Sequence, residues 1–332
     1  MNKLRDSTGR VLPKNAYIIR HTEIGSYLNC PRYWFLTSHN GLNLEPRVKD
    51  KKLRFGSAWH SGLEKRFKSN TSVMTGFQES WDKQVEELTQ ELGQGIYDET
   101  IQADLKDMLD LGIVLGEAYD EWVNTDATPK DSELKVIDVE KRLLVRIPRT
   151  YTWLAAKLDA IVEYAGAVWT MEHKTRARSS RVDNPGNVNR DIQMGLQLLA
   201  LKLAGYTDDG KTLGGAIYNL ARKQAPSSRV KNPIFARHMV YYTERQLYEL
   251  MTDLQCVHSP AMREASRLPA VTLRRYNPGI GSNCFCDWGC HAQEVCEALN
   301  RYENVEYLVG THFKSRNKNI RELIFDEMET EE

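Results

Sequence analysis

The chain has 332 residues, which is enough for one large domain or two smaller ones. A hydrophobic content of 41% and a charged content of 27% are typical of a soluble globular protein. Because no apolar run reaches about 18 residues, we expect no transmembrane helix and no membrane partner. The polar start of the chain does not resemble a secretory signal, so we expect a cytoplasmic location.

The formal net charge is zero, but the charge is unevenly distributed. Residues 77–126 hold fourteen acidic and two basic side chains, whereas residues 210–243 hold six basic and no acidic ones. Such asymmetry suits a face that binds a polyanion, opposed by an acidic solvated face. Ordinary surface charge is the alternative interpretation.

The first third of the chain is predicted to be mainly helical. Residues 1–20 suggest a short strand or arm. A short helix is expected from Thr22 up to Cys30-Pro31, because proline disfavours helix in the residue before it. Another helix is expected after Gly56-Ser57. Residues 73–126 show long helical periodicity, which we interpret as a helical insertion with breaks at Gly93, Gly95 and Gly112.

After this stretch the pattern changes to strands. Runs of β-branched and large apolar residues predict a β-meander over 136–147, 154–164 and 168–174. A helix is expected at 190–205, ending on Gly205. Two further strands are expected at 214–222 and 235–243, followed by helices at 244–267 and 297–325.

The strand MEHKTR places two charged side chains on one face. Glu172 and Lys174 point to the same side and His173 to the other, because side chains alternate along a strand. A two-residue turn at Ala165-Gly166 would put Asp159 opposite Glu172, whereas a three-residue turn would put it opposite His173. The two-residue turn is the favoured one, so we expect Asp159, Glu172 and Lys174 to form one cluster.

This cluster has an evident chemistry. Two neighbouring carboxylates repel each other unless a cation or a proton joins them. A hard divalent cation prefers such oxygen ligands, and a lysine beside it can position or deprotonate a water molecule. A simple salt bridge on a half-exposed strand is the alternative.

The Asp159, Glu172 and Lys174 pattern resembles the metal site of the PD-(D/E)XK nuclease superfamily. The sequence AAKLDAIVEY resembles its RecB-like branch, with Ala156 where glycine is usual. The resemblance covers roughly residues 17–300. It implies an α/β (α+β) fold, with a restriction-endonuclease-like core, a central mixed β-sheet flanked by helices, and a helical insertion. We divide this integrated domain into an N-terminal segment, the insertion, the nuclease core and C-terminal helices, at 1–55, 56–130, 131–245 and 246–332.

Other segments resemble motifs of the same branch, in the same order. RFGSAWHSGLE makes His60 a candidate metal ligand, and DVEKRL offers Glu140 as a further one. DIQMGLQLLALKLAG resembles the Gln-x-x-x-Tyr helix, with Gln193 as the glutamine and Gln197 in place of the tyrosine. The resemblance implies Mg²⁺ or Mn²⁺ held by His60, Asp159, Glu172 and the backbone carbonyl of His173. It implies catalytic roles for Asp159, Glu172, Lys174 and Gln193.

The six cysteines give another signal. Four of them, Cys284, Cys286, Cys290 and Cys296, lie within the thirteen residues CFCDWGCHAQEVC. Reduced thiols in a cluster indicate metal or cofactor ligands before disulfides, and zinc suits four thiolates. Cys256, inside a helical run, is expected to be a buried thiol.

The segment SYLNCPRYWFL resembles the N-terminal cysteine segment of iron–sulfur nucleases, such as AddB and the CRISPR-associated RecB-like exonucleases. That resemblance implies a 4Fe–4S cluster bound by Cys30, Cys286, Cys290 and Cys296, with Cys284 as an alternative ligand. The cluster would join the N- and C-terminal parts. Structural zinc is the alternative cofactor.

Basic residues follow the predicted metal site in the chain. We expect them to bind DNA phosphates. They are Arg176, Arg178, Arg181 and Arg190 after Lys174, and Arg222, Lys223, Arg229 and Lys231 in ARKQAPSSRVKNP.

The resemblance implies a metal-dependent DNA exonuclease that acts on single strands or DNA ends. The process would be recombination or repair, phage replication or CRISPR adaptation, with protein partners, in a bacterial or phage-infected cell. The alternatives are a non-catalytic DNA-binding or assembly subunit and a structure-specific endonuclease. Cleavage polarity and oligomeric state do not follow from the sequence.

Overall fold

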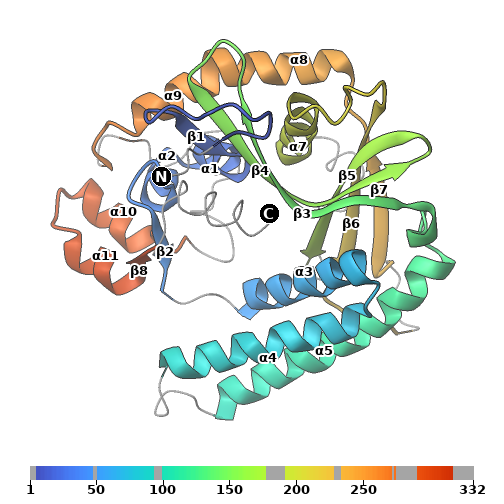
Figure 1. The fold of residues 1–332 in the computed structure, drawn as a ribbon. Helices are drawn as coiled ribbons and strands as arrows, with labels where there is room; N and C mark the ends of the chain where they lie inside the picture. The colour runs from blue at the N-terminus through green and yellow to red at the C-terminus, as the bar shows by residue number, and fades with distance from the viewer. Residues whose placement is uncertain are drawn as a thin grey trace.

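The computed structural model describes residues 5–47, 51–92, 99–176, 191–227, 233–270, 273 and 290–316. Figure 1 shows a central twisted sheet with helices on both faces. Helices α3, α4 and α5 cover one face, and α7 and α8 lie on the other. The prediction of a mixed α/β fold, with a central mixed sheet flanked by helices, is confirmed.

The sheet has six strands in the order β1-β4-β5-β6-β7, with β3 paired to β4. Pairs β1–β4 and β5–β6 are parallel, and the other pairs are antiparallel, so the sheet is mixed. The strands are β1 (Tyr17–Arg20), β3 (Lys135–Arg146), β4 (Thr152–Tyr164), β5 (Ala167–Arg176), β6 (Thr212–Arg222) and β7 (Phe235–Val240).

Strands β4 and β5 form the predicted hairpin. Tyr164 pairs with Ala167, so the turn consists of Ala165 and Gly166. Both turn residues have positive φ, 50° and 77°, as a type I′ turn requires. The two-residue turn is therefore confirmed, and the register continues as far as Ala160 opposite Met171.

Strand β4 changes its neighbour halfway along. Its first residues pair with β1 up to Ala155, which lies opposite Arg20. Its last residues pair with β5 from Ala160 onward. Between them, residues 156–159 have no ladder partner on this edge in the described strands, although β3 continues on the other edge. We call residues 156–159 the fork; helix α1 (His21–Asn29) begins beside it, directly after β1.

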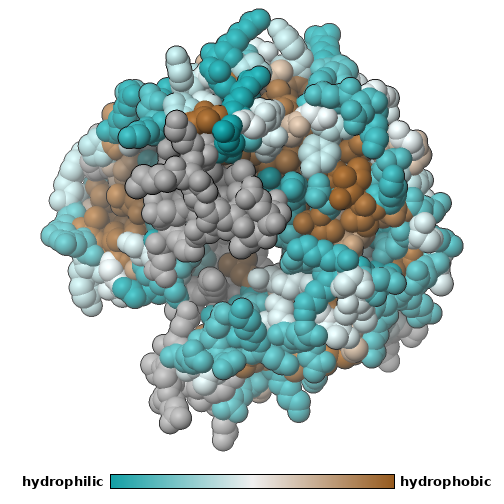
Figure 2. Space-filling model, viewed as in Figure 1, coloured by the Kyte–Doolittle hydropathy of each residue, from teal (hydrophilic) through white to brown (hydrophobic). Residues whose placement is uncertain are grey.

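Three helices form the layer on one face, namely α3 (Lys51–Ser69), α4 (Val73–Leu92) and α5 (Glu99–Thr125). Figure 2 shows that this layer presents mainly hydrophilic side chains on the viewed face. The expected start of the first helix after Gly56-Ser57 is wrong, because α3 is already helical at Lys51. The expected break at Gly112 is also wrong, since α5 continues through it. A Cβ on Gly112 would lie 2.0 Å from the Phe77 ring, so glycine permits the close approach of α4 and α5.

The other face is covered by α7 (Ile192–Leu203) and α8 (Glu244–Asp253), which continues through a π-turn (Leu254–His258) into α9 (Ser259–Ala265). Leu196 and Leu199 of α7 pack on Ile161 of β4 in the main hydrophobic cluster. Within the described part of the chain, no helix combines the length and the apolar content that a membrane crossing requires.

The two ends of the chain meet at a small second sheet. Strand β2 (Leu44–Pro46) pairs antiparallel with β8 (Phe313–Ser315). Helix α2 (Pro31–Thr37) precedes β2, and α10 (Gln293–Asn300) and α11 (Glu306–His312) precede β8. The expected single helix over 297–325 is wrong, because Tyr302 has a φ of +57° and ends α10.

Candidate active site

Asp159 lies in the fork, where β4 has lost one partner and not yet gained the next. Its Oδ2 accepts a hydrogen bond from the backbone N–H of His173 at 2.7 Å. Its Oδ1 lies 3.5 Å from Nδ1 of His60, which comes from the middle of α3. The carboxylate therefore occupies the space at the end of the β4–β5 ladder and connects the sheet to the helical layer.

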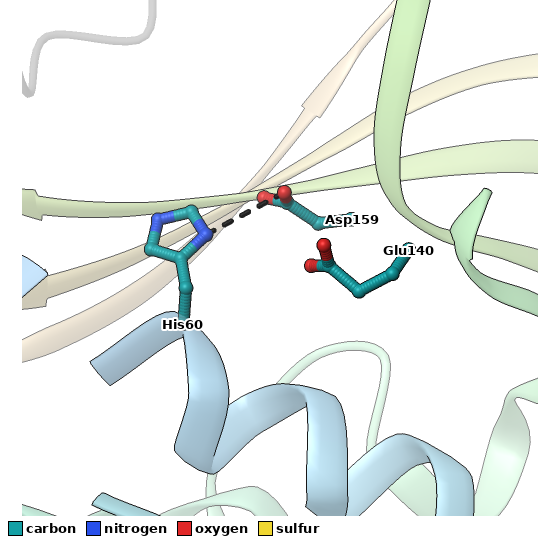
Figure 3. A group of neighbouring side chains, drawn as sticks. All are labelled: His60, Glu140 and Asp159. Atoms are coloured by element: carbon teal, nitrogen blue, oxygen red, sulfur yellow. Dashed lines mark ion pairs between the residues drawn. The ribbon is translucent and has the colours of Figure 1, made fainter. Parts of the chain in front are cut away.

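Glu140 of β3 completes a group with these two residues. Potential ligand atoms of His60, Glu140 and Asp159 all lie within 4.8 Å of one another, and Figure 3 shows the three side chains converging. Among the described residues, this is the one group of three or more His, Cys, Asp or Glu that lies so close. Glu140 has a φ of +56°, a strained conformation for a residue with a side chain.

Burial and the charges of neighbouring side chains determine the pKa values in this group. Burial disfavours ionisation of Asp159, but the hydrogen bonds and charges of His60 and His173 outweigh it and hold the pKa of Asp159 below its usual range. Burial lowers the pKa of His60, yet Asp159 and Glu172 raise it overall. Burial raises the pKa of Glu140 despite an ion pair with Lys157. Two carboxylates and an imidazole form a donor set that suits Mg²⁺ or Mn²⁺.

Glu172 is held on the other side of Asp159 by helix α7. Its Oε1 accepts from Gln193 Nε2 and its Oε2 from Gln197 Nε2, each at 2.6 Å. Gln193 Oε1 also accepts from Lys174 Nζ at 3.2 Å, and Lys174 forms an ion pair with Glu172. Gln197, in the position where the motif has tyrosine, is therefore a direct partner of the carboxylate.

Burial and the charge of Asp159 raise the pKa of Glu172. Burial lowers the pKa of Lys174, but the attraction of Glu172 outweighs it and raises the pKa overall. Lys174 is therefore held as a protonated ammonium between Glu172 and Gln193. Glu172 is not part of the 4.8 Å group of His60, Glu140 and Asp159.

His173 points to the opposite face of β5, as predicted. Its ring stacks on Phe67 of α3 at a centroid distance of 5.4 Å. Its Nδ1 accepts a hydrogen bond from Asn219 Nδ2 at 2.9 Å. Burial lowers the pKa of His173 to about 3, so the ring is neutral.

The structure describes three of the predicted phosphate-binding residues. Arg176 donates to the Tyr218 hydroxyl at 2.9 Å, and Lys223 lies over the Phe55 ring with Nζ 5.8 Å from its centroid. Arg222 is buried and donates to the Pro233 carbonyl at 2.9 Å. The remaining ones, Arg178, Arg181, Arg190, Arg229 and Lys231, lie outside the described residues.

Three predicted cluster cysteines gather at one place. Cys30, Cys290 and Cys296 line one small cavity between α2 and α10. Tyr33 N–H lies 3.4 Å from Cys30 Sγ. Arg32 donates to Cys296 Sγ at 3.1 Å. Cys284 and Cys286 lie outside the described residues. The expectation that Cys256 is buried is wrong, because this cysteine is exposed in the π-turn.

One partner in the site was missed by the sequence patterns. Lys157 pairs with Glu140 and stands two residues before Asp159 on β4. Alternation along the strand places Lys157 and Asp159 on one face, and that signal could have indicated Lys157.

Comparison with known proteins gives one decisive match. The family model described as the PD-(D/E)XK nuclease superfamily matches residues 21–297. No curated protein matches the chain. Among solved structures, the one described as "Crystal structure of SSO0001" is 12% identical, with 73% of this chain and 76% of that chain covered and a TM-score of 0.28. Since the family model spans most of the sequence, this chain belongs to the PD-(D/E)XK nuclease superfamily.

Proposed function

We propose that the protein is a Mg²⁺- or Mn²⁺-dependent deoxyribonuclease that removes nucleotides from DNA ends or single strands. Membership of the superfamily indicates a nuclease with DNA as its substrate. The observation that supports a working site most strongly is the convergence of His60, Glu140 and Asp159 within 4.8 Å. A subunit that kept only the fold would have no need to hold two carboxylates and an imidazole together.

Each site residue has a role in this proposal. His60, Glu140 and Asp159 hold the ion, together with Glu172 and the carbonyl of His173. Such an ion, when bound, stabilises negative charge on the scissile phosphate. Lys174 orients the attacking water, and its ion pair with Glu172 favours orientation over proton removal. Gln193 positions both Glu172 and Lys174 through its amide.

The test uses single- and double-stranded DNA labelled at either end, and circular DNA, with Mg²⁺ or Mn²⁺. We expect shortening of linear DNA from an end, intact circles, and loss of cleavage with a chelator. Asp159→Asn and Lys174→Ala should both lose activity, whereas Lys211→Ala, an exposed lysine at the start of β6, should retain it. Cleaved circles would support the endonuclease alternative. Binding without cleavage in Mn²⁺ would support the non-catalytic subunit.

We further propose that Cys30, Cys290 and Cys296 bind a 4Fe–4S cluster together with Cys286 or Cys284. The support is that the described three line one cavity although they lie far apart in the sequence. The cluster would fasten α2 to α10 and thereby join the two ends of the chain. Purified protein should be brown, and Cys296→Ser should bleach it, whereas Cys256→Ser should not. Colourless protein with stoichiometric zinc would refute the iron–sulfur assignment.

Assignment to the RecB-like branch rests on the motif order His60, Glu140, Asp159, Glu172, Lys174, Gln193. It supports a role in recombination or repair, phage replication or CRISPR adaptation, with protein partners. Cleavage of single strands in preference to duplexes would agree with that branch.

A further inference from the structure

A deep groove opens beside the candidate metal site. It has a volume of about 930 Å³, and Glu140 is one of its lining residues. Its walls come from the β1–α1 junction, from β3, from β4 and from the C-terminal half of α3. The groove therefore includes one proposed metal ligand, Glu140, and extends from there toward Arg20 of β1.

The lining of this groove is predominantly cationic. It contains six lysines and arginines and three carboxylates. The cations are Arg5, Arg20, Lys68, Lys141, Arg142 and Lys157. Four have an acidic partner within the lining or just outside it, namely Lys157 with Glu140, Lys68 with Glu64, Arg20 with Glu23, and Lys141 with Asp138. The Lys141 pair is the longest of them at 3.9 Å, and Arg142 is exposed at the groove wall.

A buried polar atom also lies in the groove wall. His21, the first residue of α1, lines the groove and is 7% exposed. Burial lowers its pKa to about 4, so the imidazole is neutral, and it hydrogen-bonds the backbone of Ala155. Its Nδ1 has no hydrogen-bond partner among the described residues. A buried nitrogen without a partner costs free energy, which a ligand group or water in the groove would recover.

We propose that this groove holds a single strand of DNA adjoining the scissile phosphate, with Lys141 and Arg142 of β3 contacting its phosphates. This inference rests on the proposed nuclease function and adds where the substrate lies. Cavities of roughly 300–1,000 Å³ enclose drug-sized ligands, so the groove has room for a few nucleotides of one strand and not for a duplex. The strand would cross β4 at the fork, between the groove and β5.

The experiment measures binding, so it does not depend on cleavage. Labelled single-stranded DNA and a blunt duplex of equal length are titrated with the full-length protein in a chelator, at several salt concentrations. The test variant carries Lys141→Gln and Arg142→Gln. The matched control carries Lys135→Gln and Lys211→Gln, which removes the same charge from two exposed lysines that pair with Glu163. Circular dichroism and thermal melting establish that both variants fold. If the double variant Lys141→Gln and Arg142→Gln does not fold, the single variant Arg142→Gln replaces it.

We expect the groove variant to bind the single strand on the order of tenfold more weakly at 0.1 M salt, and its salt slope to fall by about 1.4, since each phosphate contact contributes about 0.7. The control variant should bind like the unmodified protein. Equal weakening of single-strand binding in both variants would overturn the proposal. So would a duplex that binds as tightly as the single strand and loses its binding in the groove variant. If the protein binds single-stranded DNA through the groove but cleaves no DNA, the proposed nuclease function is refuted while the proposed binding site stands.

Discussion

Strand β5 carries residues of two adjoining buried polar clusters of similar composition. One is the candidate active site, where Glu172 and Lys174 lie near Asp159, His60 and Glu140. The other begins at His173, whose ring lies 6.1 Å from that of His60 between centroids. It continues through Asn219, Tyr119, Arg237 and Asp131, and we call it the arginine network. Both clusters contain a histidine, a carboxylate and a cation, and both are largely buried. Burial and charge alone would therefore not tell which of them is the active site.

The arginine network is held together by buried hydrogen bonds around Arg237. Arg237 donates to Asn219 Oδ1 and to the Tyr119 hydroxyl, each at 3.2 Å, and forms an ion pair with Asp131. Asn219 donates to Tyr119 at 2.7 Å and to His173 at 2.9 Å. The Arg237 side chain has an exposed fraction of 0%. The hydrogen-bonding groups of Arg237 are thus used within the protein, and a substrate has no access to them. Nε2 of His173 is the exception in this network, since it is buried without a hydrogen-bond partner among the described residues.

The cluster of the candidate active site differs from the arginine network in its number of carboxylates and in its opening to the groove. It has three carboxylates, Glu140, Asp159 and Glu172, and the first of these lines the groove. Asp159 and Glu172 interact unfavourably, since the charge of Asp159 raises the pKa of Glu172. An excess of carboxylates that opens on a groove distinguishes a metal site from a structural network. This distinction leads to four predictions.

The largest effect is expected from Asp159→Asn. Loss of this ligand should reduce metal-dependent cleavage on the order of a thousandfold, comparable to the loss of a key transition-state contact. The melting temperature should fall modestly at neutral pH, because the lowered pKa of Asp159 means that its ionised carboxylate is favoured in the folded protein by His60 and His173. Steady-state cleavage and thermal melting measure the two effects. A strongly destabilised variant would show that Asp159 is structural, as the arginine network is.

Arg237→Met should have the opposite profile. It leaves the Tyr119 hydroxyl and the Asn219 amide oxygen without their arginine partner, while Asp131 keeps its ion pair with Arg66, so the free energy of unfolding should fall by about 1–3 kcal/mol. Cleavage per folded molecule should persist, since the hydrogen bonds and ion pair of Arg237 go to Asn219, Tyr119, Pro129 and Asp131 and to none of His60, Glu140 and Asp159. Urea denaturation measures the loss, with Arg245→Met as a control because that side chain is 86% exposed. A selective loss of activity with normal stability would contradict the distinction between the two clusters.

Glu23 of α1 provides another buried carboxylate–histidine pair, outside the candidate metal site. Glu23 Oε1 lies 3.0 Å from His39 Nδ1 and accepts from Arg20 at 2.8 Å. Burial opposes ionisation, but these partners outweigh it and lower the pKa of Glu23 to about 2. A depressed pKa stabilises the fold above the unfolded value near 4.5, and this contribution is lost as the pH falls toward 2.

The corresponding test compares the unmodified protein with Glu23→Gln across pH. The stability difference should be about 3 kcal/mol at neutral pH and should shrink between pH 4.5 and 2. Chemical denaturation at several pH values measures it. A difference that does not change with pH would mean that Glu23 contributes by packing and not by its charge.

Ala165→Asn should have the smallest effect. Ala165 has a φ of +50° in the type I′ turn, a conformation that asparagine adopts more readily than alanine. Stability should rise by about 0.5–1 kcal/mol with cleavage unchanged, because the turn lies at the far end of the hairpin from both clusters. A change in cleavage rate would mean that the turn influences the register at Asp159.

Local rules predicted the part of the site that local geometry determines. Alternation and a two-residue turn were enough to place Glu172 and Lys174 on one face of β5, to turn His173 to the other, and to bring Asp159 to the end of the same hairpin ladder. The fork was not predictable, because it depends on β1 pairing with β4 across most of the N-terminal half. The predicted helix break at Gly112 was wrong, because glycine is required there by the close approach of the Phe77 ring from another helix. Contacts between distant segments leave no local periodicity, and each of these failures involves such a contact.

The pairing of β1 with β4 also has a consequence for synthesis of the protein. Tyr17 pairs with Thr152, 135 positions later in the chain. At about 5–20 residues per second, β1 leaves the ribosome roughly 7–27 s before its partner strand is made. Gln193 and Gln197, which hold Glu172, follow later still. The candidate active site is therefore incomplete during synthesis, and the nascent chain can assemble it only after α7 has been translated.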